Sequence, residues 1–302
     1  MSITVVIPTY NRVGKLIQTL DSLKNQTCSN FNVLVMDDGS LDDTFQKIQH
    51  IKNTYPYKID IYTQVNSGAS KANNNALSRI KEGLIILLDD DIIASDNLIQ
   101  KHIEHHEKYP QCLLSGAANT VQDSISTDIE KYKIHMENEW KKITNNGTEP
   151  LKVNFENFVI TTANMSFTKE VFEAIGNFDE TLRDGYDFEF GLRALCKNIP
   201  SYFDLNITSI HNDKITLRYY AKRQRCYIES KKKIFADNPD YKSFFKKETD
   251  YKINFLRKLI YQILKSNFSV NFIENSSLFK ILPQQIRYKF YGSTIAALSL
   301  EL

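Results

Sequence analysis

The feature that most constrains the fold is an alternation, through residue 109, of short β-rich runs with segments whose apolar residues have helical spacing. We expect strands at 3–8, 31–38, 58–63 and 83–91, and helices at 14–26, 44–55, 69–82 and 97–109. Strands separated by helices of this length are typical of βαβ units, in which successive strands run parallel. The sequence therefore predicts an α/β protein with a Rossmann-like, mostly parallel central sheet flanked by helices.

The remainder of the chain changes character twice. Residues 120–158 are polar and irregular, and we expect an insertion there with one helix near 128–142. Further elements are expected as a strand at 157–167, helices at 168–180 (ended at Gly176) and 186–198, and a strand at 201–213 that ends at His211. From residue 216 the chain becomes basic and aromatic-rich, and it is expected to be mainly helical to residue 302.

These changes suggest two domains. We predict a first domain at 1–215, with a nucleotide-binding half at about 1–118 and an acceptor half at about 119–215, followed by a helical C-terminal extension at 216–302. The Tyr, Phe, Ile and Leu residues that alternate with Lys in the extension fit helices packed on the domain. A homodimer contact, a peripheral membrane contact and a platform for the acceptor are the functional alternatives for these helices.

Composition excludes several classes of protein. A net charge of +2 with 25% charged residues gives no overall electrostatic case for nucleic acid, which leaves only the basic helix 216–233 as a weak alternative. The four cysteines are widely spaced and fit free thiols in a reducing cytoplasm rather than zinc ligands or a disulfide scaffold. The N-terminal apolar run is expected to be a strand and not a signal peptide, and no apolar run reaches the roughly 18 residues of a transmembrane helix. We therefore expect a cytoplasmic protein, with contact to the inner face of the membrane left open.

Polar residues follow three of the predicted strands. These are Thr9-Tyr10-Asn11-Arg12, Asp37-Asp38-Gly39-Ser40 and Asp89-Asp90-Asp91. One such cluster is explained by helix capping. Three clusters are better explained by a ligand site, because ligands of open α/β sheets bind at the carboxyl ends of the strands.

The motifs "VVIPTYNR", "VLVMDDGSLDDT", "LLDDD" and "NMSFTKEVFEAIGNFDETL…DGYDFEFGLR" occur in this order over residues 3–211. In order and spacing they resemble the successive signatures of family 2 glycosyltransferases with the GT-A fold. The resemblance covers about two-thirds of the chain and leaves out the C-terminal extension. It implies inverting transfer of a sugar from a nucleotide-sugar donor with the help of a divalent cation.

The resemblance assigns the aspartate run to Mn²⁺ or Mg²⁺. The family's DxD pattern is matched by Asp89 and Asp91. It implies that Asp91 binds the metal, that Asp89 faces the ribose or sugar of the donor, and that Asp90 contacts the donor or nearby backbone. His211, at the end of a strand-like run, would complete the metal shell. His102 and His106 have the i, i+4 spacing of helical metal ligands, but we expect them on a solvated helix face.

The donor pocket is also assigned by resemblance. Pro8 and Tyr10 would line the base site, and Asp38 would accept the N3–H of uracil, which favours a UDP-sugar. Arg12 would bind phosphate or cap a helix, and these alternatives remain open. Relatives often carry an arginine where this chain has Asn73, and Lys71 is the nearest replacement, without the bidentate geometry of a guanidinium.

Deprotonation of the acceptor requires a carboxylate. Asp187 aligns with the usual base, Glu189 is the second candidate and Asp184 the third. The acidic residue that normally precedes the base is replaced by Tyr186. Asn164 and Ser166 lie on one face of a predicted strand and would support a sugar or make structural hydrogen bonds.

Three other functions are alternatives to a glycosyltransferase. A sugar nucleotidyltransferase would favour a glycine-rich loop after the first strand, whereas "PTYNRVGK" has a single glycine. A non-catalytic nucleotide-binding module would bind nucleotide without turnover. Nucleic-acid binding would show salt-sensitive affinity. We expect the acceptor to be a glycan, a lipid-linked sugar or a peptide.

Overall fold

The structure is a computed structural model that describes residues 1–120, 125, 127–142, 148–245 and 254–300. The chain divides into two compact units, one formed by 1–121 with 141–212 and the other by 122–140 with 213–302. This division differs from the expected domain boundaries, because the predicted helix near 128–142 belongs to the unit that contains the C-terminal helices. Parts of two predicted segments, at 121–124, 126, 143–147, 246–253 and 301–302, lie outside the described residues.

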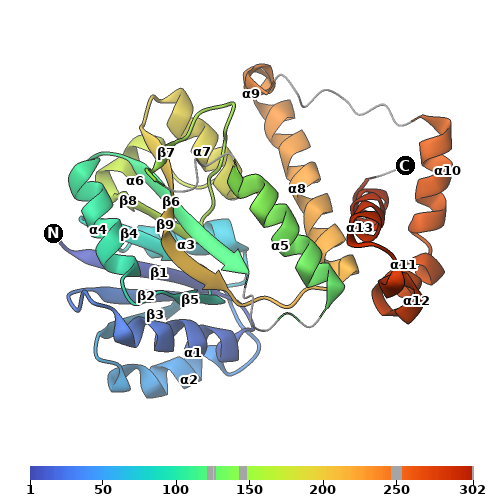
Figure 1. The fold of residues 1–302 in the computed structure, drawn as a ribbon. Helices are drawn as coiled ribbons and strands as arrows, with labels where there is room; N and C mark the ends of the chain where they lie inside the picture. The colour runs from blue at the N-terminus through green and yellow to red at the C-terminus, as the bar shows by residue number, and fades with distance from the viewer. Residues whose placement is uncertain (121–124, 126, 143–147, 246–253, 301–302) are drawn as a thin grey trace. The chain divides into compact units, whose positions relative to one another are not determined.

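The first unit is built on a nine-stranded sheet with the order β3-β2-β1-β4-β8-β6-β9-β5, and β7 pairs with β9 (Figure 1). The strands are β1 (Ile3–Thr9), β2 (Asn32–Asp37), β3 (Lys58–Thr63), β4 (Leu84–Leu88), β5 (Ile92–Ala94), β6 (Leu113–Thr120), β7 (Leu151–Lys152), β8 (Asn164–Thr168) and β9 (Ser201–His211). Strands β1–β4, β6 and β9 run in one direction, and β5, β7 and β8 run in the opposite direction. The mostly parallel sheet is thus confirmed, while β5, β6 and β7 are additions to the predicted strands.

Helices cover both faces of this sheet. They are α1 (Val13–Ser22), α2 (Thr44–Ile51), α3 (Ala69–Leu77), α4 (Leu98–Lys108), α6 (Lys169–Ile175) and α7 (Tyr186–Cys196), with short 3₁₀ turns at Leu23–Asn25 and Lys52–Thr54. Alternate residues of β1, such as Val5 and Ile7, pack with Leu16 of α1 and Leu98 of α4 in one core. On the other face Phe167 stacks on Phe172 of α6.

Strand register brings the polar loops to one edge. Thr9 and Asp37, the last residues of β1 and β2, are paired in parallel register. Strand β4 runs parallel to β1 on the other side, so the loop that carries Asp89–Asp91 leaves the same edge. Strand β5 follows this loop at once and pairs antiparallel to β9, which places Ile92 opposite His211.

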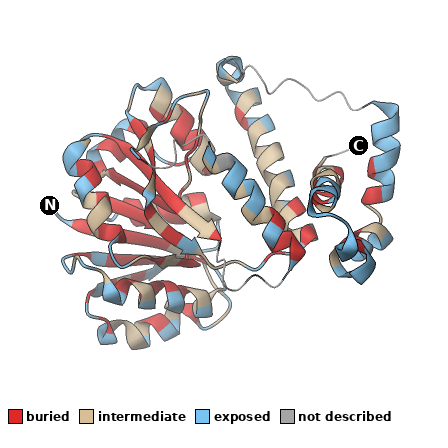
Figure 2. Cartoon of the chain, viewed as in Figure 1, coloured by how far each residue is buried: buried red, intermediate tan, exposed pale blue. Residues whose placement is uncertain are grey.

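The second unit is helical. It contains α5 (Asp128–Lys141), α8 (Leu217–Asp237), α9 (Pro239–Phe244), α10 (Phe255–Leu264), α11 (Asn267–Asn275), α12 (Ser277–Ile281) and α13 (Gln284–Ser299). Its own core joins Tyr132 of α5, Leu217 of α8, Leu264 of α10 and Tyr291 of α13. Figure 2 shows that α10–α13 bury one side and leave another exposed. Within the described part of the chain, every helix is too short or too polar to cross a membrane.

Candidate metal and nucleotide site

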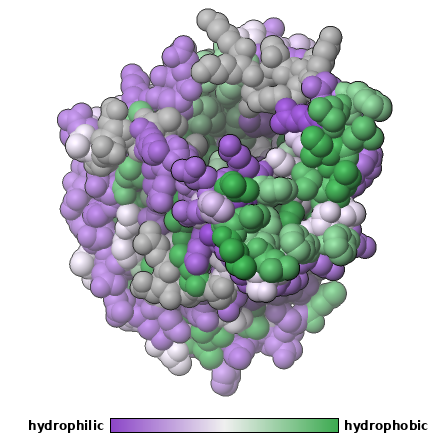
Figure 3. All heavy atoms as spheres, turned by 45° about the vertical axis from the view of Figure 1, so that its right-hand side comes forward, coloured by the Kyte–Doolittle hydropathy of each residue, from purple (hydrophilic) through white to green (hydrophobic). Residues whose placement is uncertain are grey.

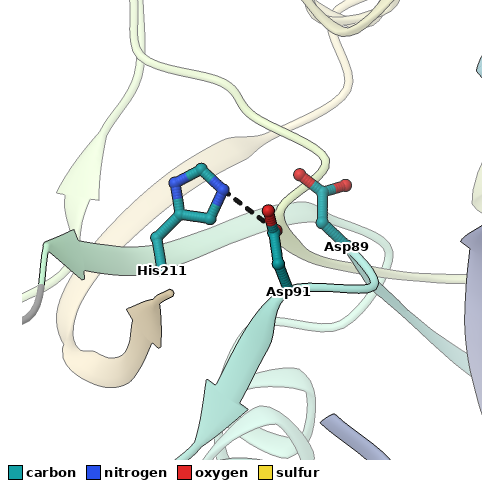
Figure 4. Close-up of side chains that lie close together, drawn as sticks. All are labelled: Asp89, Asp91 and His211. Carbon is teal, nitrogen blue, oxygen red and sulfur yellow. Dashed lines mark ion pairs between the residues drawn. The ribbon is translucent and has the colours of Figure 1, made fainter. Parts of the chain in front are cut away.

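The aspartate run and His211 converge at the end of β4 (Figure 4). Asp89, Asp91 and His211 each offer one ligand atom, and these atoms lie within 4.8 Å of one another. Asp91 Oδ1 is 3.0 Å from His211 Nε2. The backbone fixes this approach, because Asn212 N donates to the carbonyl of Asp91 at 2.8 Å.

Two cations from the loop and helix after β1 also reach the aspartates. Arg12 Nη1 donates to Asp90 Oδ1 and to Asp91 Oδ2, both at 3.1 Å. Lys15 Nζ lies 3.4 Å from Asp91 Oδ2. Arg12 stands at the N-cap of α1 without a capping bond from its side chain. Its guanidinium therefore neutralises the aspartate run, an arrangement that neither of the two expectations for Arg12 anticipated.

The two buried aspartates differ in their electrostatics. Burial raises the pKa of the Asp90 carboxyl, even though the charge of Arg12 and a 2.8 Å hydrogen bond from Thr9 oppose this. Burial also acts to raise the pKa of Asp91, but the hydrogen bond and charge of His211 and the charges of Arg12 and Lys15 outweigh it, so its pKa is well below the usual range. The Asp91 carboxyl is therefore ionised at neutral pH.

The residues present fit a divalent cation. A carboxylate oxygen of Asp89, one of Asp91 and an imidazole nitrogen of His211 form a compact set of donors. Twice a metal–oxygen bond of about 2.1 Å is about 4.2 Å, so the donor atoms need to move by less than an ångström to share one ion. Carboxylates suit Mg²⁺ and Mn²⁺, while the imidazole also suits softer metals.

The loops after β1 and β2 are tied together by Asn11, a residue to which sequence reasoning gave no role. Asn11 has a φ of 53°, and its side-chain oxygen accepts from Leu41 N at 2.6 Å. Its own N–H donates to Ser40 Oγ at 2.8 Å. In the loop after β2, only a glycine fits at position 39, because a Cβ there would lie 2.8 Å from the backbone nitrogen of Asn66. An Asn after a predicted strand end was the only available signal.

The expected base-binding residues lie at this edge. Tyr10 is exposed and Pro8 half-buried, whereas Asp38 is buried. Asp38 accepts hydrogen bonds from Gln64 Nε2, Ser67 N and Gly68 N at 2.7–2.9 Å. These hydrogen bonds hold the loop before α3 in place. A carboxylate can accept about four hydrogen bonds, so about one acceptor site of Asp38 remains for a ligand.

Helix α3 carries Asn73, at the position where relatives often have an arginine, and Lys71, the nearest basic residue. Lys71 is 3.6 Å from Glu180 in a half-exposed ion pair. Asn73 is buried, and its Nδ2 lies 3.5 Å from the hydroxyl of Tyr186. Its Oδ1 has no hydrogen-bond partner among the described residues. Neither side chain reproduces a guanidinium at this point.

The three candidate bases differ in their surroundings at the start of α7. Asp187 is half-buried in the first turn, and its Oδ1 accepts from Phe188 N at 2.8 Å. Glu189 is buried and makes a bidentate ion pair with Arg193, with N–O distances of 2.6 and 2.8 Å. Asp184 precedes the helix and is half-buried.

The start of α7 is tied to the edge at which β4 ends. Tyr186 Oη is 3.3 Å from Thr162 Oγ1, two residues before β8 begins at Asn164. Asn164 is paired with Leu88, the residue before Asp89. Asp187 therefore follows a residue that is anchored beside the aspartate run.

The histidines of α4 correct one expectation. His102 and His106 are buried and do not form a solvated face, because they bond to Asn164 and Ser166 of β8. His102 contacts Asn164 Oδ1 and Ser166 Oγ at 2.8 Å each, and His106 Nε2 contacts Ser166 Oγ at 2.8 Å. Asn164 and Ser166 thus make structural hydrogen bonds, which was one of their two expected roles.

Comparison with known proteins establishes the class to which this fold and site belong. The model of the family described as "Glycosyl transferase family 2" matches residues 4–176, more than half of the chain. The chain therefore belongs to glycosyltransferase family 2. The family predicted from the motifs is confirmed.

Several relatives are similar over part of their length. An uncharacterized glycosyltransferase of Bacillus subtilis is 33% identical over 38% of this chain and 30% of its own length. One from Haemophilus influenzae is 24% identical over 73% of this chain and 69% of its own length. The GalNAc(5)-diNAcBac-PP-undecaprenol beta-1,3-glucosyltransferase of Campylobacter jejuni is 27% identical over 43% of this chain and 44% of its own length. The match with the B. subtilis relative thus spans less than a third of that protein.

Solved structures share the fold. A mannosyltransferase from Pyrobaculum calidifontis, in complex with GDP-Man and Mn²⁺, superposes with a TM-score of 0.64 at 15% identity over 98% of this chain and 85% of its own. Residues 1–349 of S. aureus TarS, in complex with UDP-GlcNAc, give a TM-score of 0.56 at 15% identity over 99% of this chain and 90% of that one. The expected GT-A fold is confirmed.

Proposed function

We propose that this protein is an inverting, metal-dependent glycosyltransferase that transfers a sugar from a UDP-sugar to a hydroxyl group of a lipid-linked or polymeric acceptor. The observation that carries the proposal is the convergence of Asp89, Asp91 and His211 within 4.8 Å at the carboxyl edge of the sheet. An edge of this kind is where ligands of open α/β sheets bind. The family and the fold are consistent with it.

Asp91 and His211 would hold the cation, with Asp89 beside it and towards the donor. The cation, when bound, neutralises the charge of the departing diphosphate as a Lewis acid. Arg12 and Lys15 already lie at this point, and their positive charges would meet the donor phosphates. Lys71 would contribute a further, more diffuse charge. Asp90 would position the site by anchoring Arg12 and the hydroxyl of Thr9.

The nucleotide would lie over the loops that follow β1 and β2. The exposed ring of Tyr10 offers a stacking surface beside Pro8. Asp38 would accept the N3–H of uracil with its remaining lone pair, and this favours a uridine donor. Fold neighbours are recorded with UDP-GlcNAc and with GDP-Man, so the fold itself allows either base.

Asp187 would act as the base. It would take the proton of the acceptor hydroxyl as the oxygen attacks the anomeric carbon, while the bond from that carbon to the diphosphate oxygen breaks and UDP leaves. A single displacement inverts the anomeric configuration. Because Glu189 is held by Arg193 on both oxygens, we place the base at Asp187 and give Glu189 a structural role.

The test is release of the nucleoside diphosphate from a panel of UDP-, GDP- and dTDP-sugars with an acceptor extract, with and without Mn²⁺. We expect release from a UDP-sugar that requires the metal. Asp91→Asn should reduce it by at least about a hundredfold. The matched control is Asp21→Asn, which removes a half-exposed carboxylate paired with Lys24 and should leave release unchanged.

Proton NMR of the product would show whether the anomeric configuration is inverted. Binding of UDP-sugars without turnover, in the presence of every acceptor fraction, would support the non-catalytic module instead. Activity that is unaffected by chelation or by Asp91→Asn would refute the metal site. Formation of a nucleotide-sugar from a sugar phosphate would support the nucleotidyltransferase alternative.

A further inference from the structure

The C-terminal helices carry many large apolar side chains that are exposed and are not part of the core of their own unit. Phe255 of α10 is 77% exposed, Phe268 of α11 is 80% and Ile281 of α12 is 77%. We call the following set the C-terminal apolar face: Phe255, Leu256, Leu259, Ile260, Ile263, Phe268, Phe272, Leu278, Ile281, Leu282, Ile286 and Phe290. In Figure 3 the hydrophobic colour spreads over a broad area of these helices. Exposed apolar areas of this kind mark interaction surfaces.

Helix α10 has the pattern of a helix that is apolar on two sides. Its five exposed members of the face fall within an arc of about 140° at 100° per residue. Tyr261 and Leu264 are buried on another part of the same helix and join the core of the unit. Helix α10 thus packs into the core through other residues, and its exposed apolar stripe is available for a different contact.

The exposed residues of α11, α12 and α13 are connected. Phe268 stacks on Phe272 with centroids 6.4 Å apart, and Phe272 meets the buried Phe279 of α12 at 6.1 Å. Phe279 in turn meets Phe290 of α13 at 5.8 Å. Helix α10 joins this group through Ser269 Oγ, which donates to the carbonyl of Ile263 at 2.8 Å. These contacts pack the four helices together, and apolar side chains cover a broad area of their surface in Figure 3.

Basic residues outnumber acidic ones on these four helices. Between residues 254 and 300 the basic residues are Arg257, Lys258, Lys265, Lys280, Arg287 and Lys289, and Glu274 is the single acid. Glu274 is used internally, since its carboxylate accepts from Leu217 N at 2.6 Å, and Arg287 pairs with the buried Asp128. Lys258, Lys280 and Lys289 are exposed, and Lys258 lies one helical turn from Phe255.

We propose that the C-terminal apolar face docks on an anionic lipid surface, with its apolar side chains at the headgroup boundary and its lysines on the phosphates. Apolar residues bordered by cations are the pattern of helices that lie in the membrane interface. A second copy of this chain fits less well, because a twofold contact would place the cationic border of one copy against that of the other. This goes beyond the proposed function, because it concerns a surface that carries none of the proposed site residues.

The experiment measures sedimentation of the full chain with vesicles of phosphatidylcholine alone and of phosphatidylcholine mixed equally with phosphatidylglycerol. We expect binding to the mixed vesicles, weakened by salt. Ile263→Gln with Phe268→Gln and Ile281→Gln should weaken it at least tenfold, whereas Ile263→Val with Phe268→Leu and Ile281→Val should leave it within about twofold. Lys258→Gln, Lys280→Gln and Lys289→Gln should each weaken it about fivefold.

Equal binding to both vesicles, or loss of binding in the conservative variant, would overturn the proposal. So would a concentration-dependent dimer in analytical ultracentrifugation that the glutamine variant abolishes while neither vesicle binds. Release of UDP from the UDP-sugar in the presence of a water-soluble acceptor, measured without vesicles, separates this from the proposed function. The glutamine variant should retain that activity even though it no longer binds lipid.

Discussion

The side chains of Asn73 and Tyr186 lie against each other, with Nδ2 3.5 Å from the phenolic oxygen. These are two of the positions at which the chain is expected to depart from the pattern of its family, in α3 and at the start of α7. An arginine and an acidic residue would form a charged pair at this contact, and here the pair is neutral. We infer that the two departures compensate each other, and that they leave a neutral contact beside the proposed base.

This relationship predicts a rescue. Asn73→Arg should destabilise the protein by more than about 2 kcal/mol, because the site is only 1% exposed and the contact of Asn73 there, the Tyr186 hydroxyl, carries no charge. Adding Tyr186→Glu should restore at least half of the loss, since it supplies the missing partner. Urea-unfolding midpoints of the single and double variants measure both effects. Lys71→Arg on the same helix, at a half-exposed position, is the control and should change stability by less than about 0.5 kcal/mol. If Tyr186→Glu adds its own cost to that of Asn73→Arg, the two changes are independent and the interpretation fails.

Arg12 occupies one oxygen of the proposed metal ligand Asp91, at 3.1 Å. In the protein without nucleotide it competes with a cation for that oxygen. We expect Arg12→Gln to strengthen Mn²⁺ binding about fivefold, as measured by the loss of the free Mn²⁺ signal in electron paramagnetic resonance. The same variant should weaken UDP binding, because the guanidinium no longer meets the phosphates. Lys24→Gln, which changes a surface pair with Asp21, serves as the control for net charge. A variant that binds both ligands more weakly would show that Arg12 shapes the site rather than competing for it.

Asp187 and Glu189 allow a matched test, because the same change from carboxylate to amide can be made two residues apart on α7. Asp187→Asn should lower turnover by at least about a hundredfold with little change in stability or donor affinity. Glu189→Gln should do the reverse. It removes the negative charge and one of the two acceptor oxygens facing Arg193, which keeps the carbonyls of Ile175 and Asn177, so we expect a loss of about 3 kcal/mol and turnover within about tenfold of the wild type. Turnover and urea unfolding are measured on both variants. The assignment of the base to Asp187 would be contradicted if Glu189→Gln abolished transfer without destabilising the fold.

The sequence predicted the parts of the fold that depend on local periodicity. The strands and helices through residue 109 follow from the spacing of apolar residues, and the motif order indicated Asp91 and His211 as a pair. Strand β6 was missed because "LLSGAANT" ends in small residues without alternation, and β5 because it is three residues long. The pairing of Arg12 with Asp90, across 78 residues, depends on tertiary packing and leaves no local signal. The histidines of "KHIEHHEKY" looked solvated because charged residues surround them, but their partners lie on β8, about 60 residues further along the chain.

Those histidines form a chain of hydrogen bonds whose donors can be assigned. Asn164 Nδ2 donates to the carbonyl of Ile207 at 3.1 Å, so its Oδ1 accepts from His102 Nε2. His102 Nδ1 then accepts from Ser166, and Ser166 accepts from His106 Nε2. His106 Nδ1 is left to accept from the thiol of Cys112, 3.6 Å away, and burial raises the pKa of that thiol to about 12. The chain is complete only while both imidazoles are neutral.

The free energy of unfolding should therefore decrease as the pH is lowered through a defined window. Burial lowers the pKa of His102 to about 4 and that of His106 to about 3, and it lowers the pKa of the neighbouring His105 to about 4 despite the charge of Asp204. The unfolded chain takes up these protons near pH 6.5, so stability is complete above that pH and is lost as the pH falls towards 4. Each histidine should cost about 1.4 kcal/mol per pH unit below 6.5, or about 2 kcal/mol at pH 5. Urea unfolding at pH 7.5 and pH 5 measures the loss. His102→Gln keeps a donor and an acceptor but cannot titrate, so its pH dependence should be weaker by one proton. An equal slope in this variant would show that other groups cause the loss.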